Sequence, residues 1–270
     1  MHDPFSVFLC PVCGMPLSAD SAALHCANRH CFDLAKQGYV NLLMANSSCK
    51  RHGDDRLMVQ ARKRFLDKGY YAPLRQAVND MLGEGHTVLD AGCGEGYYTA
   101  LFAQKNQVYG VDISKDALKY AAKRCPTARF AVASISAIPL ADGAVDTVVN
   151  IFAPDCPAQF ARVLQPGGRF IQVMPMEDHL MELKAAVYDA PYRNPPVCTA
   201  QPGFVLRASR TVKYRITLDC SEDIDALFKM TPYYYKTSRA DQEKAAKLTQ
   251  LDTRLEFFIA EYGKAEDADA

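Results

Sequence analysis

A glycine-rich turn constrains the fold of this 270-residue chain more than any other feature. A short apolar run ends at Asp90, and the pattern G-x-G-x-G follows with Gly92, Gly94 and Gly96. Glycine lets the backbone of such a strand-to-helix turn approach a ligand closely. Dinucleotide-binding domains carry G-x-G-x-x-G instead, which is shaped for a pyrophosphate. Because the Asp90 carboxylate would repel a pyrophosphate, the turn favours a ligand that carries an ammonium or sulfonium cation.

Short apolar runs alternate with helical patterns from residue 86 onward. We predict strands over 86–90, 107–112, 128–133, 145–151 and 169–174, and helices over 95–104, 115–124 and 158–164. Crossovers this short predict a mostly parallel, doubly wound sheet of the α/β class. Two later alternating runs, 211–218 and 255–262, are expected to close the sheet as an antiparallel pair.

A second acid, Asp112, lies 22 residues after Asp90 at the end of the second predicted strand. A carboxylate in this position can accept hydrogen bonds from both hydroxyls of a ribose, and Ile113 beside it would cover one face of an adenine. The turn LQPGG at 164–168 is a third marker. In this order and spacing, the markers resemble class I S-adenosylmethionine-dependent methyltransferases. The alternative is a Rossmann-like domain that binds another ligand.

Four of the ten cysteines, Cys10, Cys13, Cys26 and Cys31, fall within 22 residues. A Cys-x2-Cys knuckle and a second Cys/His pair can form a closed tetrahedral site, which suits zinc in a structural role. The fourth ligand is either His30 or Cys31, and the Cys-x3-His knuckle that His30 gives is the preferred choice. A module of about 30 residues is too small to fold without its metal.

The chain divides into three expected parts. Residues 1–42 form the zinc-binding module, residues 43–82 a linker with helices, and residues 83–270 the α/β domain. In the middle part, apolar residues recur at helical spacing, and the stretch Gly-Tyr-Tyr-Ala-Pro separates two helices. No apolar run approaches the roughly 20 residues that cross a membrane. Because the N-terminus also lacks a signal-peptide pattern, we expect a cytoplasmic protein without a membrane partner.

The charge balance limits how the chain can bind nucleic acid. With 31 basic and 31 acidic side chains, the net charge of zero argues against binding by bulk charge alone. Residues 1–80 nevertheless hold ten Lys/Arg against seven Asp/Glu. The basic residues cluster at Lys50, Arg51, Arg56 and 62–64. They form either a solvated helix face or a contact for a polyanion.

Motifs from both ends of the chain, taken together, resemble a more specific family than the class I methyltransferases as a whole. The cysteine pattern is followed by FDLAKQGYVNL at 32–42, ARKRFLDKGYYAPL at 61–74 and DAGCGEGYYT at 90–99. Later pieces are HLMELK at 179–184 and MTP at 230–232. This combination resembles the family of 23S rRNA guanine-N1 methyltransferases over nearly the whole chain.

The resemblance implies transfer of a methyl group from S-adenosylmethionine to N1 of a guanine in a large-subunit hairpin of 23S ribosomal RNA. It also implies a zinc module that recognises RNA, and the enzyme could act as a homodimer. The implied zinc ligands are Cys10, Cys13, Cys26 and His30. The implied contacts of the methyl donor are Tyr71, Tyr98, Thr99 and His179. The chain departs from the family at 233–235, where tyrosines stand in place of an aromatic residue that is often tryptophan.

The segment 150–154 lies where related enzymes hold their target base, so Phe152 could stack on a guanine; an ordinary loop is the alternative. Loss of the N1 proton would be assisted by a carboxylate, for which Asp155, Glu177 and Asp178 are all candidates. Two other functions are compatible with the sequence. One is a methyltransferase for a small molecule or protein with a purely structural zinc knuckle, and the other is a catalytically silent RNA-binding protein.

Overall fold

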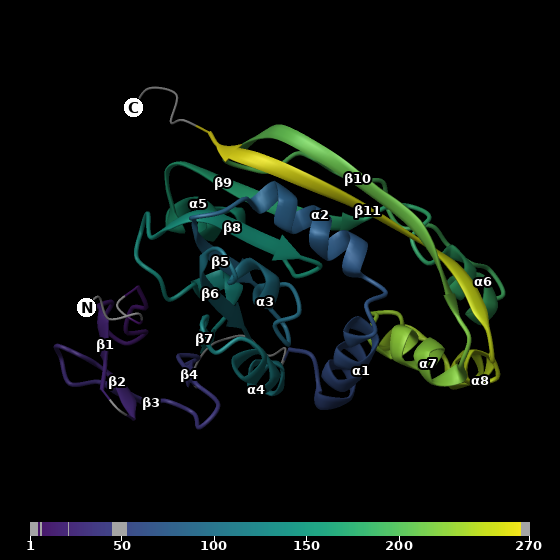
Figure 1. Cartoon of the computed structure of the whole chain (residues 1–270), viewed down its shortest axis with the longest axis horizontal. Helices are drawn as coiled ribbons and strands as arrows, with labels where there is room; N and C mark the ends of the chain where they lie inside the picture. The colour runs from purple at the N-terminus through teal and green to yellow at the C-terminus, as the bar shows by residue number, and fades with distance from the viewer. Residues whose placement is uncertain (1–4, 6, 21, 45–52, 266–270) are drawn as a thin grey trace.

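The computed structural model describes residues 5, 7–20, 22–44 and 53–265. Its main element is an eight-stranded sheet with the order β10-β11-β9-β8-β5-β6-β7-β4 (Figure 1). The strands are β4 (Tyr39–Asn41), β5 (Thr87–Ala91), β6 (Gln107–Asp112), β7 (Arg129–Val132), β8 (Val145–Ile151), β9 (Leu164–Pro175), β10 (Phe204–Leu218) and β11 (Leu251–Lys264). The pairs from β4 through β9 are parallel, and β9–β11 and β11–β10 are antiparallel. The prediction of a doubly wound α/β sheet with an antiparallel closing pair is confirmed.

Both faces of the sheet are covered, which explains the continuous apolar runs of its central strands. Successive side chains alternate between faces, so Val88 and Val108 pack in one core while Leu89 and Tyr109 pack in the other. The helices are α1 (Arg56–Asp67), α2 (Ala72–Leu82), α3 (Thr99–Phe102), α4 (Lys115–Arg124), α5 (Pro157–Val163), α6 (Met181–Val187), α7 (Ser221–Lys229) and α8 (Arg239–Ala246), with short 3-10 turns η1 (Ile135–Ala137) and η2 (Tyr234–Lys236). Residues of α1 to α4 belong to the first core, and those of α5 belong to the second. None of the described helices is long and apolar enough to cross a membrane.

The helix expected over 95–104 is much shorter in the structure. α3 spans only Thr99–Phe102, and residues 92–98 form turns instead. The three glycines of this stretch have positive φ angles, between 55° and 84°, which a right-handed helix does not allow. The glycine turn is therefore longer than its sequence pattern indicates, and it leaves more backbone free to line a ligand.

The cysteine-rich N-terminus forms a separate three-stranded antiparallel sheet of β1 (Leu17–Ala19), β2 (Ala23–Cys26) and β3 (Cys31–Asp33). This module, called the ribbon below, is attached to the α/β domain at two places. Phe8, which precedes it, forms an isolated bridge with Leu140 in the connection between η1 and β8, and the following strand β4 extends the main sheet beside β7. The proposed domain boundary after residue 42 therefore falls just beyond a strand of the main sheet. Lys50 and Arg51, named above as basic residues, lie outside the described residues.

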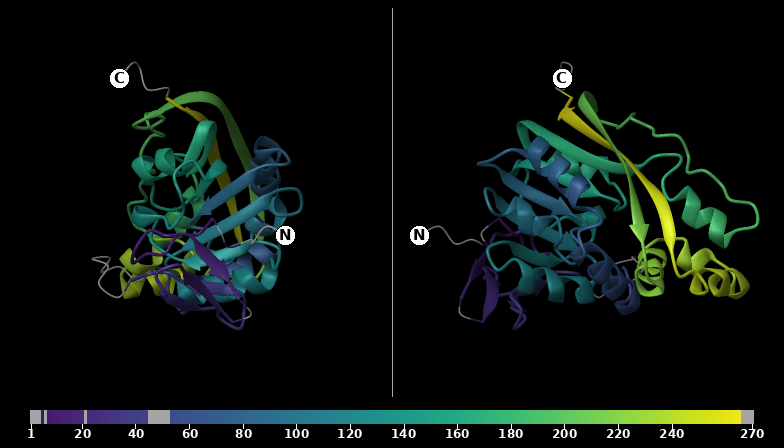
Figure 2. Two further views of the ribbon diagram at one scale, coloured as in Figure 1. Left: turned by 90° about the vertical axis from the view of Figure 1, so that its left-hand side faces the viewer. Right: turned by 45° about the vertical axis from the view of Figure 1, so that its right-hand side comes forward.

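The two ends of the sheet have different partners. Figures 1 and 2 place the ribbon at the β4 end, and the long pair β10–β11 arches over the opposite end. Helices α7 and α8 lie between β10 and β11 in the sequence, and α7 packs against α1. Lys68, just after α1, donates to both carboxylate oxygens of the buried Asp223 at 2.6 Å. These contacts bring a C-terminal segment next to the end of α1.

Candidate functional site

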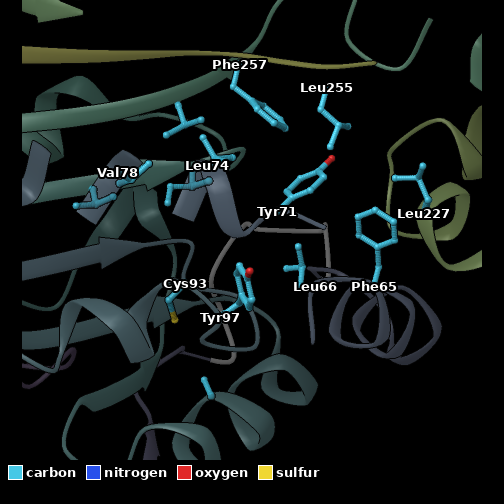
Figure 3. Close-up of a cluster of buried hydrophobic side chains, with 14 of the residues drawn as sticks. Phe65, Leu66, Tyr71, Leu74, Val78, Cys93, Tyr97, Leu227, Leu255 and Phe257 are labelled. Atoms are coloured by element: carbon cyan, nitrogen blue, oxygen red, sulfur yellow. The ribbon is translucent and has the colours of Figure 1, made fainter. Parts of the chain in front are cut away.

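A cavity of about 1160 Å³ lies at the carboxyl ends of β5, β6 and β8. Ligands of open parallel sheets bind at this edge. The turns that follow these three strands line the cavity, together with residues 53–66 and 230–236. Figure 3 shows part of the neighbouring apolar core, where Tyr71 lies among Phe65, Leu66 and Phe257. The cavity thus combines a polar glycine turn with an aromatic wall.

The predicted glycine turn forms the floor of the cavity. A Cβ atom added to Gly92 would overlap Ala153, and one added to Gly96 would lie 2.9 Å from Ala121 Cα. Both residues have positive φ angles. Any larger side chain would therefore displace the neighbouring turns as well as strain the backbone.

Asp90 and Thr99 meet at the start of α3. The Thr99 hydroxyl donates to Asp90 Oδ2 at 2.6 Å, and both side chains are buried. Burial raises the pKa of Asp90 to about 7; the Thr99 hydrogen bond opposes this shift, and the charges of Asp112 and Glu95 add to it. A cation bound in the cavity would favour the ionised form of this carboxyl group.

Asp112 and Ile113 lie at the end of β6, where the sequence predicts them. Asp112 Oδ2 accepts the Gly94 N–H at 2.9 Å, and its Oδ1 accepts the Ser114 N–H at 2.7 Å. Burial raises the pKa of Asp112, although these two N–H groups oppose the shift. The carboxylate thus fixes the glycine turn in addition to the role toward a ribose that the sequence predicts. The backbone at Gly53 lies close over Ile113, since an added Cβ would be 2.5 Å from its Cγ2.

Three further predicted residues, Tyr71, Tyr98 and His179, line the same cavity. The Tyr98 hydroxyl is buried without a hydrogen-bond partner among the described residues. His179 Nδ1 accepts the Glu256 N–H at 3.2 Å, which leaves Nε2 to carry the proton of the neutral ring. Burial, together with the charge of Lys184, lowers the pKa of His179 to about 3. The ring is therefore a neutral donor at physiological pH.

Sequence reasoning missed several charged residues of this cavity, and Arg62 and Glu95 are the two nearest the glycine turn. Arg62 forms an ion pair with Asp54 and lies over Gly94, whose added Cβ would be 3.7 Å from the guanidinium Nη1. The buried Glu95 is near Arg62, and its Oε1 has no hydrogen-bond partner among the described residues. Glu95 lies inside the glycine motif, which is a signal for it. Arg62 belongs to a run of three basic residues and could not be distinguished from its neighbours.

The predicted metal ligands come together in the ribbon. The ligand atoms of Cys10, Cys13, Cys26 and His30 all lie within 4.8 Å of one another. A tetrahedral zinc site with Zn–S bonds of about 2.3 Å has sulfur–sulfur edges of about 3.8 Å, and Cys13 Sγ lies 3.7 Å from Cys26 Sγ. A hydrogen bond from the Met15 backbone holds the pKa of Cys13 at about 6, which favours the thiolate. Cys31 is exposed and lies outside this group.

The segment after β8 faces the cavity with an exposed aromatic ring. Phe152 is 45% exposed and has a φ angle of 57°, in the left-handed region that L-residues rarely adopt. Its ring lies 6.4 Å from that of Tyr71, edge to face. Asn150 Nδ2 donates to the Pro154 carbonyl at 2.9 Å and ties the segment to the end of the strand. Strain of this kind is concentrated at functional sites.

Comparisons with known proteins agree with these two sites. Residues 88–168 match the family model described as a methyltransferase domain, and residues 8–49 match the one described as RlmA, N-terminal. A Bacillus subtilis (strain 168) protein, provisionally named a 23S rRNA (guanine-N(1)-)-methyltransferase, is 34% identical over 270 residues, which cover 91% of this chain and 94% of that protein. The chain belongs to the 23S rRNA (guanine-N1)-methyltransferase family. The resemblance predicted from the motifs is confirmed.

Other relatives of this rRNA methyltransferase match over shorter stretches. The 23S rRNA (guanine(748)-N(1))-methyltransferase of Streptomyces fradiae is 39% identical over 188 residues, which cover 66% of each chain. Among solved structures, the YcgJ protein of Bacillus subtilis matches with a TM-score of 0.50 at 17% identity, over 73% of this chain and 100% of that one. That likeness shows the fold alone. The cavity fits S-adenosylmethionine, because it offers a glycine cradle and an unpartnered Tyr98 hydroxyl. The ribbon fits zinc, because it offers three thiols and an imidazole.

Proposed function

We propose that this chain transfers a methyl group from S-adenosylmethionine to N1 of a guanine in a hairpin of 23S ribosomal RNA. The proposal depends on one combination. The chain has a methyl-donor cavity with an exposed aromatic ring beside it, and it also has a zinc ribbon. Over nearly its full length, this chain matches a relative named for this activity. Such an activity on ribosomal RNA would be cytoplasmic, and the homodimer remains a prediction.

The proposed binding site for the methyl donor consists of Tyr71, Asp90, Gly92, Gly94, Gly96, Tyr98, Thr99, Asp112, Ile113 and His179. All of these except Gly96 and Thr99 line the cavity, and those two shape it from behind. The methyl donor supplies an electrophilic methyl group on a positively charged sulfur. Asp90 would stabilise the cationic part, and Asp112 would accept hydrogen bonds from the ribose. At the other end of the methyl donor, the Nε2–H of the neutral His179 would donate a hydrogen bond, and the Tyr98 hydroxyl would donate or accept one.

We further propose that Cys10, Cys13, Cys26 and His30 hold one zinc ion, and that the ribbon contributes to RNA recognition. A closed site of three thiolates and one imidazole leaves no position for a substrate, so its role is structural. The target base would reach the cavity unpaired or flipped from its stack. Catalysis would then depend mainly on the orientation of N1 toward the methyl group and on exclusion of water.

The test is transfer of labelled methyl groups from S-adenosylmethionine to deproteinised 23S rRNA, followed by mass mapping of the product. We expect one guanine to become N1-methylated. Gly92→Val should reduce the rate by about 10²-fold or more, because its side chain would overlap Ala153 and displace the turn. RNA binding without transfer would indicate a silent binder. Label found only in small molecules or protein would support the other alternative.

A further inference from the structure

The sequence leaves three acids as candidate acceptors of the N1 proton, and the structure distinguishes among them. Asp155 lines the large cavity, and neither Glu177 nor Asp178 does. Asp178 instead forms ion pairs with Arg193 at 2.9 Å and with Arg254 at 3.9 Å. Asp155 is therefore the candidate that a base in the cavity can reach.

The other carboxylates of the cavity either have partners or lie at the glycine turn. Asp54 is paired with Arg62, and Asp55 accepts hydrogen bonds from the Tyr235 hydroxyl at 2.5 Å and the Met58 N–H at 2.9 Å. The remaining acids, Asp90, Glu95 and Asp112, lie in or beside the glycine turn, which is proposed to hold the methyl donor. Asp155 follows β8 and lies on the side of the exposed Phe152.

Two glutamines fix one edge of the Asp155 carboxylate. Its Oδ2 accepts hydrogen bonds from Gln172 Nε2 at 3.2 Å and from Gln201 Nε2 at 3.1 Å. Gln201 Nε2 also donates to Gln172 Oε1 at 2.9 Å, and Gln172 is buried in β9. Asp155 Oδ1 accepts no hydrogen bond from any residue that the structure describes. One oxygen is thus anchored to the sheet, and the other is available to a ligand.

The neighbouring segment provides a place for a flat base. Phe152 exposes its ring to the cavity. Its backbone keeps the strained left-handed conformation in the folded structure. Asn150 Nδ2 donates to the carbonyls of Ala91 at 3.5 Å and of Pro154 at 2.9 Å, and so connects this segment to the glycine turn. A base stacked on Phe152 would therefore have the methyl donor on one side. Asp155 belongs to the same wall of the cavity as Phe152.

The chemistry of guanine matches this arrangement. Its Watson–Crick edge presents two adjacent donors, the N1–H and the N2 amino group, and a carboxylate accepts from such a pair. We propose that Asp155 recognises this edge of the target guanine and that its Oδ1 accepts the N1 proton, with Gln172 and Gln201 as positioning residues. The inference depends on the proposed function. As the proton passes to Oδ1, N1 forms its bond to the methyl carbon, and the electron pair of the broken carbon–sulfur bond stays on sulfur. Solvent later removes the proton from the carboxyl group.

The first test compares Asp155→Asn with Glu177→Gln in the full-length enzyme. Single-turnover methylation of a 23S rRNA fragment should be about 10²- to 10⁴-fold slower for Asp155→Asn, the usual contribution of a general base. The control Glu177→Gln removes a candidate acid that does not line the cavity, and its rate should equal that of the wild type. The affinity of both variants for S-adenosylmethionine, measured by calorimetry, should be unchanged. A wild-type rate for Asp155→Asn, or an equal loss of its affinity for the methyl donor, would overturn the assignment.

The pH dependence distinguishes a proton acceptor from a structural residue. Without an acceptor, only guanine that has already lost its N1 proton reacts, so the rate of Asp155→Asn should rise about tenfold per pH unit below the pKa of guanine N1. The wild-type rate should rise less steeply. Gln201→Ala, which frees Asp155 from one of its two anchors, should slow the reaction and keep the wild-type pH profile. Parallel pH profiles for wild type and Asp155→Asn would refute the role, whereas a wild type that does not methylate guanine N1 would refute the proposed function instead.

Discussion

At the scale of single residues, the carboxyl group of Asp90 makes the cavity sensitive to pH. Its pKa of about 7 results mainly from burial. An acid with this pKa is about 10% ionised at pH 6 and about 90% at pH 8. Only the ionised form attracts a sulfonium or ammonium group. We therefore expect the dissociation constant of S-adenosylmethionine, measured by calorimetry, to fall about tenfold from pH 6 to pH 8.

The matched control for this prediction is Asp90→Asn. It keeps the shape of the side chain and removes the titration, so binding should be weaker than in the wild type at pH 8 and nearly independent of pH. His179 does not complicate the comparison, because a group with a pKa of about 3 stays neutral throughout this range. If Asp90→Asn retained the wild-type pH dependence, another group would be responsible.

The sequence predicts those site residues whose position follows from a local pattern. Asp90 and Asp112 lie at strand ends, and glycines fix the turn between them, so their meeting in one cavity is predictable. The direction of Arg62 is not, because Lys63 and Arg64 beside it have the same charge and only the packing of α1 turns one of the three inward. The anchors of Asp155 are also unpredictable, since Gln201 comes from an irregular segment 46 residues away.

At the scale of elements, the parallel strands β5 to β9 were predicted well, whereas β4 and the C-terminal helices were not. The predicted helix over 115–124 has the bounds of α4, which has a serine N-cap and an apolar face. In contrast, α6, α7 and α8 were missed. α8 buries only Ala245 among its eight residues, and α7 has the consecutive buried run Ala226–Phe228. α8 therefore has no apolar stripe and depends on tertiary packing. In α7, by contrast, Ile224, Leu227 and Phe228 lie on one helical face, a pattern that the prediction overlooked.

The zinc ribbon allows a test at this scale. Cys26→Ser removes a proposed ligand at the end of β2, and we expect loss of the single bound zinc per chain together with faster hydrogen exchange in 23–26. Exchange in β5 and β6 should stay slow, because both strands are buried and are hydrogen-bonded to a neighbouring strand on each side. Metal analysis and hydrogen exchange with mass spectrometry measure both effects.

Cys31→Ser is the control, since Cys31 is the exposed neighbour of His30 and the alternative ligand. It should retain one zinc per chain and wild-type exchange. Retention of zinc by Cys26→Ser would contradict the ligand assignment. Loss of zinc in Cys31→Ser, with full occupancy in His30→Ala, would mean that Cys31 and not His30 is the fourth ligand.

At the scale of the whole molecule, α1 lies between the cavity and the solvent. Its residues line the cavity on one side, and Lys63 and Arg64 are on the other side, 39% and 50% exposed. Both are paired, Lys63 with Asp67 at 2.5 Å and Arg64 with Asp223 at 3.9 Å. The Lys63–Asp67 pair is exposed, and such pairs contribute about 0–1 kcal/mol. Asp223 is buried, but it keeps its hydrogen bonds from Lys68 and Tyr70 when Arg64 moves away. Both ion pairs could therefore be exchanged for phosphate contacts at little cost.

The three basic residues 62–64 are thus expected to have two separate roles. Lys63→Ala/Arg64→Ala should weaken RNA binding and reduce the slope of log K against log salt by up to about two, about one per phosphate contact. It should leave the affinity for S-adenosylmethionine unchanged. Arg62→Ala should weaken the binding of S-adenosylmethionine and leave the affinity for RNA unchanged. Its loss leaves Asp54, Glu95 and Asp112 without their nearby cation around the glycine turn. RNA affinity over a salt series and calorimetry with S-adenosylmethionine measure the two effects. Salt lines of equal slope and height for wild type and the double variant would mean that Lys63 and Arg64 form only a solvated helix face, and RNA affinity would then have to come from the ribbon or another surface.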